Sequence, residues 1–138
     1  MVGDLIEIKI IKNETKSIRA QLLISEESLN NGDKVSIELS LNNKSVFFIE
    51  EDNFFVALQS LRGELEKSQM QILCNGAALN VYSSPMQMAM GGRKAYILTK
   101  GEQARMDKIV DIFDKDRVLK YTTVKKQKKY YFEWLESL

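Results

Sequence analysis

The sequence predicts an α+β protein in which an N-terminal antiparallel sheet of about four strands packs on an amphipathic helix, followed by further short strands and two more helices. Apolar residues alternate with polar ones over the first fifty residues, and a helical apolar stripe follows directly. The length of 138 residues suits one globular domain over residues 1–138. The hydrophobic fraction of 44% is too high for a disordered chain.

Four strands are expected within residues 5–49. Turn-prone asparagines separate the apolar runs, which favours hairpins and a simple meander. Strict alternation indicates that one face of the sheet is in water and the other needs cover. The apolar positions are Ile6, Ile8 and Ile10, then Ile18, Ala20, Leu22 and Ile24, then Val35, Ile37, Leu39 and Leu41, and finally 46–49.

A helix over residues 52–67 is predicted to cover the apolar face. Asp52 or Asn53 can cap its first turn, and Gly63 is its one unfavourable residue, at about 1 kcal/mol relative to Ala. We expect Glu64 and Lys67 to be exposed. The apolar stripe expected to be buried comprises Phe54, Phe55, Leu58, Leu61 and Leu65.

The second half of the chain is less regular. A short strand is expected over 70–74, and breakers without a constant period predict a long, ordered loop over 75–93. Next come a strand over 95–99 and a helix over 102–114, whose apolar side is formed by Ala104, Met106, Ile109, Val110 and Phe113. Val118–Leu119 and residues 121–124 are compatible with a strand. A terminal helix over 125–138 is expected to bury Tyr131, Trp134, Leu135 and Leu138.

The missing residue types narrow the possible chemistry. Histidine is absent, which excludes Ser-His-Asp and Cys-His catalysis and the imidazole ligand of most zinc sites. The single cysteine excludes an internal disulfide and a zinc ribbon, and fits a reducing compartment. A carboxylate magnesium site or a paired-carboxylate hydrolase stays open. We expect no enzyme, no cofactor and no metal.

Location follows from the apolar content. No apolar run approaches the ~20 residues of a membrane helix, and the first residues lack the basic and apolar regions of a signal peptide. We therefore expect a cytoplasmic protein without a membrane partner.

Three local patterns each have a chemical and a structural interpretation, and we favour the structural one each time. Cys74 ends an apolar strand, where a buried thiol is more common than a nucleophile. Ser83 or Ser84 with Lys94 could mimic a Ser-Lys dyad, but such residues meet by chance in many loops. Gly91-Gly-Arg-Lys94 could wrap an anion, yet it lacks P-loop spacing and fits a tight turn before a strand.

Charge is distributed unevenly along the chain. Residues 1–69 hold 8 Lys/Arg and 12 Asp/Glu, a balance of −4, whereas residues 70–138 hold 12 and 7, a balance of +5. The two segments can pack together in one domain, which we favour, or mark charged partners. Lysines at 125, 126, 128 and 129, beside Tyr130 and Tyr131, suit either nucleic-acid binding or a solvated helix face.

An acidic group suggests a protein partner. These carboxylates can serve helix capping and solubility, or they can dock a basic protein. Apolar residues of the 75–93 loop, namely its Met residues and Tyr82, can fill the core or anchor a partner. The candidate partner-binding residues are Glu50, Glu51, Asp52, Glu64, Glu66, Tyr82, Met86 and Met88.

The region 73–113 resembles a known group of proteins. Its segments are Leu73-Cys-Asn-Gly-Ala, Asn80-Val-Tyr-Ser-Ser-Pro-Met86, Met90-Gly-Gly-Arg-Lys-Ala-Tyr96 and Val110-Asp-Ile-Phe113. They are similar to small bacterial proteins that include immunity partners of polymorphic or contact-dependent growth-inhibition toxins. The resemblance implies a non-enzymatic cytosolic domain that binds and blocks one cognate toxin domain. It assigns no functional residue, and the alternative is a small nucleic-acid- or anion-binding module that uses the Lys-rich C-terminal segment.

Overall fold

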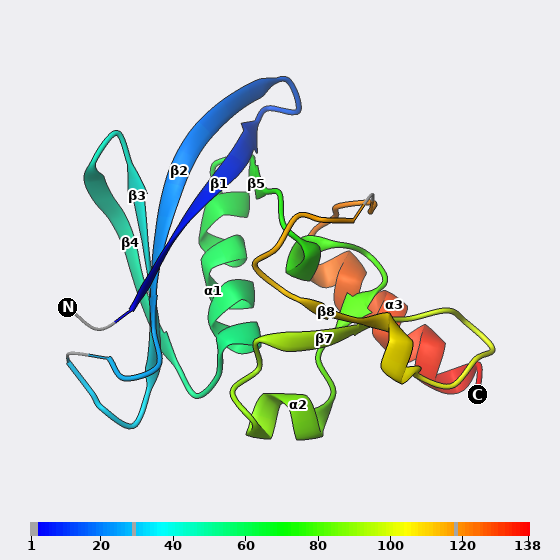
Figure 1. The fold of residues 1–138 in the computed structure, drawn as a ribbon. Helices are drawn as coiled ribbons and strands as arrows, with labels where there is room; N and C mark the ends of the chain where they lie inside the picture. The colour runs from blue at the N-terminus through cyan, green and yellow to red at the C-terminus, as the bar shows by residue number, and fades with distance from the viewer. Residues whose placement is uncertain (1–2, 29, 118) are drawn as a thin grey trace.

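An antiparallel five-stranded sheet in the order β4-β3-β2-β1-β5 curls around one face of helix α1 (Figure 1). The structure is a computed structural model that describes residues 3–28, 30–117 and 119–138. The predicted α+β class and the four-strand N-terminal meander are confirmed. The elements of this half are β1 (Asp4–Lys12), β2 (Lys16–Ser25), β3 (Val35–Leu41), β4 (Lys44–Glu51), α1 (Phe54–Glu66) and β5 (Met70–Ile72).

Two tight hairpins connect β1 to β2 and β3 to β4. Asn13 and Glu14 form the first turn with φ angles of 52° and 65°, and Asn42 and Asn43 form the second with 52° and 63°. Two successive positive φ angles give the turn whose twist matches paired strands, and asparagine tolerates them well. The asparagine signal therefore predicted these turns correctly.

Helix α1 begins at the predicted cap. The Asn53 side chain accepts a hydrogen bond from the backbone N–H of Val56 at 3.0 Å. Lys67 is exposed as expected, whereas Glu64, which pairs with Lys67, is only half-exposed. The predicted apolar stripe is buried throughout, at Phe54, Phe55, Leu58, Leu61 and Leu65.

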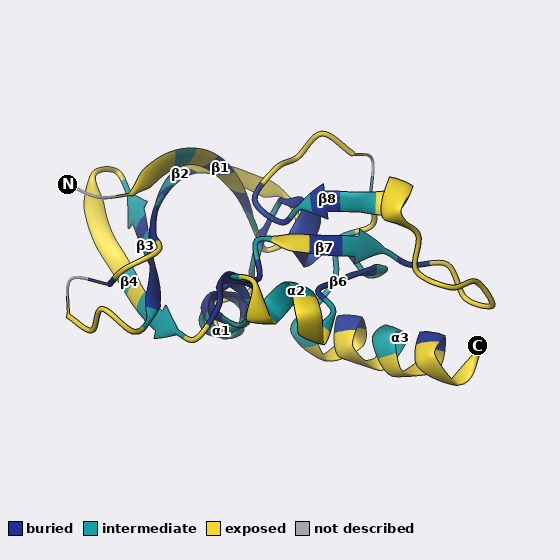
Figure 2. Ribbon diagram, turned by 60° about the horizontal axis from the view of Figure 1, so that its bottom comes forward, coloured by how far each residue is buried: buried dark blue, intermediate teal, exposed yellow. Residues whose placement is uncertain are grey.

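A second, three-stranded antiparallel sheet in the order β6-β7-β8 lies on the other side of α1, with helix α3 against it (Figures 1 and 2). Its strands are β6 (Val81–Tyr82), β7 (Lys94–Ile97) and β8 (Ile109–Asp111), and α3 spans Val124–Glu136. The predicted 75–93 loop is not continuous, since it contains the 3-10 turn η1 (Asn75–Ala77), β6 and the short helix α2 (Pro85–Ala89).

The helix predicted over 102–114 is wrong. Residues 101–108 are exposed, with one 3-10 turn, η2 (Met106–Lys108), and Ile109–Asp111 pairs with β7 as a strand. Val110, Ile112 and Phe113 are buried, but Met106 is 79% exposed. The apolar positions between Ala104 and Phe113 are spaced as on one side of a helix. Pairing with β7 instead supplies backbone hydrogen-bond partners that make Ile109–Asp111 a strand.

The C-terminal helix is confirmed, but part of its expected burial is wrong. Trp134 is buried, whereas Tyr131 is half-buried and Leu135 and Leu138 are exposed. The face turned to the protein contains the buried Gln127 and Trp134, seven residues apart, so Leu135 is rotated away. In the preceding segment, Tyr121 makes an isolated bridge to Ala78 rather than a strand, and Val118 lies outside the described residues.

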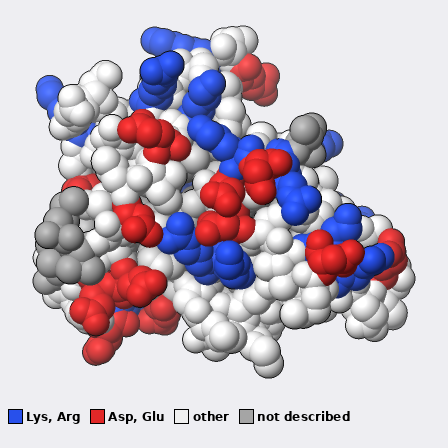
Figure 3. Space-filling model, viewed as in Figure 1, with Lys and Arg blue, Asp and Glu red and all other residues white. Residues whose placement is uncertain are grey.

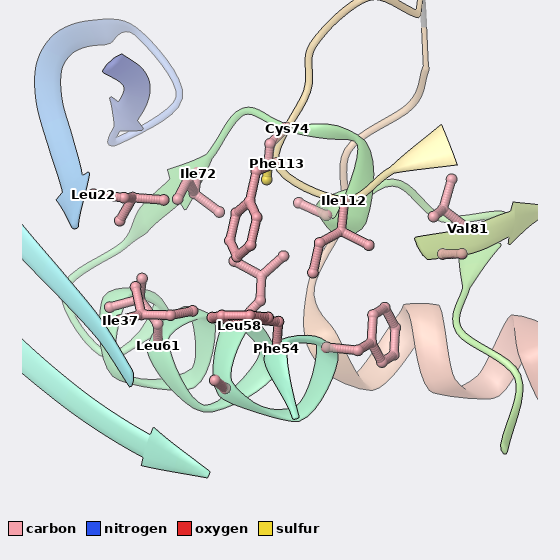
Figure 4. Packing of buried hydrophobic residues seen from close by; sticks show 14 of the residues in the cluster. Leu22, Ile37, Phe54, Leu58, Leu61, Ile72, Cys74, Val81, Ile112 and Phe113 are labelled. Carbon is pink, nitrogen blue, oxygen red and sulfur yellow. The ribbon is translucent and has the colours of Figure 1, made fainter. Parts of the chain in front are cut away.

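A continuous apolar core joins the two sheets through α1 (Figure 4). Leu22 and Ile37 enter it from the large sheet, Leu58 from the helix, and Val81 and Ile112 from the second half. Burial of apolar area between sheet and helix faces is the main favourable contribution to the free energy of folding.

Candidate interaction surfaces

An acidic surface forms where β2 ends, β3 begins and β4 ends. The strand register brings these ends together, since Ser25 pairs with Ser36 and Ser36 pairs with Glu50. Figure 3 shows the resulting cluster of carboxylates at the lower left. We call it the acidic surface, and its residues are Glu26, Glu27, Asp33, Glu50, Glu51 and Asp52.

Short contacts fix three of these carboxylates. Glu50 accepts a hydrogen bond from the Ser28 hydroxyl, and Glu51 accepts one from the Ser60 hydroxyl at 2.8 Å. Asp52 pairs with Lys34, which raises the pKa of that lysine. Because Glu26, Glu27 and Asp33 are exposed beside this set, the surface carries a strong negative field.

Glu64 and Glu66 do not belong to the acidic surface. They lie at the C-terminal end of α1, a helix about 20 Å long at 1.5 Å per residue, while residues 50–52 precede its N-terminus. Glu64 pairs with Lys67 at 3.2 Å. Glu66 accepts a hydrogen bond from the backbone N–H of Val124 at 3.0 Å, so its carboxylate stabilises the start of α3.

The five predicted acidic residues therefore form two separate groups. Glu26, Glu27 and Asp33, which the sequence interpretation missed, complete the first group. The predicted meander is the signal that could have found these three residues. In a meander, the second and fourth strands finish at the end of the sheet where the third strand begins.

The expected apolar anchors have different environments. Tyr82 is 8% exposed and stacks on Tyr131 with ring centroids 4.0 Å apart. It also packs in an edge-to-face arrangement with Phe55, with ring centroids 4.8 Å apart. It is therefore a core residue and not an available anchor. Met88 is half-buried against the core, whereas Met86 is 74% exposed on α2. Of the three, Met86 projects most freely from the surface.

The three residue patterns with a chemical alternative all serve the structure. Burial raises the pKa of the Cys74 thiol to about 12, which keeps it protonated at neutral pH. Ser83 donates to the backbone carbonyl of Lys94 at 2.9 Å, and Ser84 caps α2 by accepting from the N–H of Gln87 at 3.1 Å.

The Gly91-Gly92 segment is a turn that packs on the start of α1. Gly91 and Gly92 have φ angles of 112° and 73°, and the Gly91 carbonyl accepts a hydrogen bond from the N–H of Phe54 at 2.8 Å. Arg93 pairs with Asp4 and Asp111, at 3.1 and 2.9 Å, and its guanidinium lies 5.6 Å from the ring centroid of Phe113, so two carboxylates and a ring already engage this cation.

A lysine surface covers the first half of α3. Lys125, Lys126, Lys128 and Lys129 are all exposed. The neighbouring rings already have partners. The Nζ atom of Lys100 lies 4.8 Å from the ring centroid of Tyr130, and Tyr131 stacks on Tyr82. The surface thus offers cations more readily than stacking platforms.

A groove of about 630 Å³ lies between β5 and the segment that leads into α3. Apolar Met70 and Tyr121 line it together with the carboxylates of Glu14 and Glu66. Across residues 3–28, 30–117 and 119–138, no three cysteine or carboxylate side chains gather closely enough to hold a metal ion.

No family model matches this chain, and no curated protein matches it significantly. None of the helices in the described ranges is both long and apolar enough to cross a membrane.

Proposed function

We propose that the protein is a non-enzymatic immunity protein, or antitoxin, of a bacterial contact-dependent growth-inhibition or polymorphic toxin system. It acts in the cytoplasm, where it binds the toxin domain of its cognate system and blocks it. The acidic surface is the observation that carries this proposal. The resemblance over residues 73–113 supports it as well.

Electrostatic complementarity explains how such a surface would work. Toxin domains that cleave nucleic acid present basic active sites, and a rigid cluster of carboxylates competes for the same cations as the phosphates of the substrate. Long-range attraction raises the association rate, and complementary charge excludes wrong partners. Glu50 and Glu51 lie at the end of β4, and the contacts of Ser28 with Glu50 and of Lys34 with Asp52 hold the connection that carries Glu26, Glu27 and Asp33 beside them.

Inhibition of the toxin domain encoded beside this gene tests the proposal. The wild-type protein should abolish toxin activity at equimolar concentration, and Glu26→Lys/Glu27→Lys should require more protein for the same inhibition. Glu102→Lys/Glu136→Lys is the matched control, because both residues are exposed and the net charge change is identical. Equal inhibition by both double variants would contradict a role for the acidic surface.

Anion or nucleic-acid binding through the lysine surface is the second candidate function. Lys125 and Lys126 lie in the first turn of α3, where the positive end of the helix dipole disfavours cations. A bound phosphate would offset this unfavourable arrangement. Fluorescence anisotropy with a labelled single-stranded RNA should detect such binding, and Lys125→Glu/Lys128→Glu should remove it.

A further inference from the structure

Two Asn-Gly sequences occur in the chain, Asn31-Gly32 and Asn75-Gly76. An asparagine before glycine is chemically labile, because glycine has no Cβ to shield the backbone nitrogen that follows the asparagine side chain. That nitrogen can attack the side-chain amide only where the chain can bend back on itself. The two sequences have opposite environments, so the fold decides which of them reacts.

Asn31-Gly32 lies in the exposed connection between β2 and β3, at the lower left of Figure 1. It forms a turn closed by a hydrogen bond from the N–H of Lys34 to the backbone carbonyl of Asn31 at 3.0 Å. The N–H of Asp33 donates to the side-chain oxygen of Asn31 at 3.2 Å. This side-chain turn folds the Asn31 amide over the backbone that follows it and polarises its carbonyl group toward attack.

Asn75-Gly76, in contrast, is fixed by hydrogen bonds in the core. Asn75 is fully buried, and its side-chain nitrogen donates to the backbone carbonyl of Asp111 at 3.1 Å and to the carboxylate of Asp116 at 2.9 Å. The N–H of Gly76, the group that would have to react, donates to the carbonyl of Ile112 at 2.8 Å. Rotation of this segment would break hydrogen bonds between buried groups, which are costly to leave unpaired.

We propose that Asn31 deamidates spontaneously in the folded protein and that Asn75 does not. The backbone nitrogen of Gly32 attacks the side-chain carbonyl carbon of Asn31. The proton of that nitrogen passes through solvent to the departing amide, which leaves as ammonia, and a five-membered succinimide ring remains. Water then opens the ring at either of its two carbonyl groups, which leaves aspartate or isoaspartate at position 31.

Either product changes the connection between β2 and β3. A new carboxylate appears two residues before Asp33, so the acidic surface gains one negative charge. In isoaspartate the main chain runs through the former side chain, and the carbonyl that accepts from Lys34 becomes a free carboxylate. The turn is then one atom longer and loses the hydrogen bond that closes it. The reaction itself does not depend on the proposed function, and either proposal can fail without the other.

Peptide mapping by mass spectrometry follows the reaction while the purified protein is incubated at mildly alkaline pH. Trypsin releases Asn31 within residues 20–34 and Asn75 within residues 68–93, so fragment spectra show the conversion of each amide to a carboxylate separately. In the folded protein, Asn31 should react more than about tenfold faster than Asn75, because Asn75 reacts only in molecules in which its segment has opened. In guanidinium chloride the two rates should become similar.

Gly32→Ala is the test variant, because a Cβ at this position would meet no atom within 4 Å and the fold should remain intact. The added methyl group should slow the reaction at Asn31 severalfold. Gly63→Ala is the matched control, since its Cβ also enters open space, and it should leave the rate at Asn31 unchanged. Equal rates at Asn31 and Asn75 in the folded protein would overturn the proposal. So would an Asn31 that reacts only in guanidinium chloride, or one whose reaction Gly32→Ala does not slow.

Discussion

The guanidinium of Arg62 on α1 donates a 2.6 Å hydrogen bond to the side-chain carbonyl of Gln127 on α3, and both residues are buried. Arg62 also donates to the carbonyls of Gly76 and Thr122 at 3.2 and 2.8 Å, and Gln127 donates to those of Gly76, Ala78 and Val81 at 2.8 to 2.9 Å. No carboxylate forms an ion pair with Arg62 within the described ranges, so neutral oxygens stabilise its charge. Burial lowers the pKa of this arginine. The pair joins α1, α3 and the η1 segment.

Replacing Gln127 should destabilise the protein strongly. Gln127→Ala removes an acceptor from a buried cation and the amide group that donates to three buried carbonyls, which should cost about 3–5 kcal/mol of unfolding free energy. Urea unfolding measures this loss. The neighbouring exposed variant Lys126→Ala should change stability by no more than about 0.5 kcal/mol. Similar unfolding curves for both variants would show that the buried network contributes little.

Filling a vacant position on α1 should stabilise the protein. A Cβ at Gly63 would meet no atom within 4 Å, and alanine is the better helix former, so Gly63→Ala should add about 0.5–1 kcal/mol. A Cβ at Gly76 would instead lie 2.6 Å from Leu58 Cδ2 and 2.8 Å from Ile112 Cβ. Thermal melts should therefore show a higher Tm for Gly63→Ala and a lower one for Gly76→Ala. The opposite order would contradict the packing described for α1.

Truncating the centre of the core should have the cost usual for a filled site. Leu58 is fully buried between the two sheets, and Leu58→Ala should lower the unfolding free energy by about 2–5 kcal/mol. Guanidinium unfolding gives the value. A loss below about 1 kcal/mol would mean that the site collapses readily around the smaller side chain.

The stability of the protein should fall at alkaline pH through Cys74. The pKa of its thiol is raised to about 12 from an ordinary value of 9.0, so the folded state retains a proton that the unfolded state releases. This contribution is fully present below pH 9 and is lost as the pH rises toward 12, with a limiting slope of about 1.4 kcal/mol per pH unit. Urea unfolding at pH 8 to 10.5 should show a steeper decline for wild type than for Cys74→Ala. Parallel declines would place the thiol in contact with water.

The N-terminal half of the fold could be predicted from the sequence because its signals are local. Alternation in β3, the Asn42-Asn43 turn and the Asn53 cap each act within a few residues. The second half depends on distant partners. The apolar residues between Ala104 and Phe113 have a spacing that fits a helix, and only pairing with β7, which starts fifteen residues before β8, makes Ile109–Asp111 a strand.

The candidate site was predictable to a similar extent. Residues 50–52 were identified from their charge alone, but the contribution of Glu26 and Glu27 requires the register of β2 and β3. The charge pattern places Glu66 in the same surface, but its hydrogen bond to the start of α3 gives it a structural role. Charge composition thus indicated a partner-binding segment, and topology defined its extent.

Titration calorimetry with a cognate toxin domain, the partner that the proposed function requires, tests the proposed neutralising role most directly. The protein should bind it saturably at micromolar concentration or below, and binding should weaken as salt rises and in Glu26→Lys/Glu27→Lys. The matched Glu102→Lys/Glu136→Lys variant should bind like wild type. An absence of binding heat, together with salt-sensitive binding of RNA through the lysines of α3, would contradict the immunity function and favour the nucleic-acid-binding alternative.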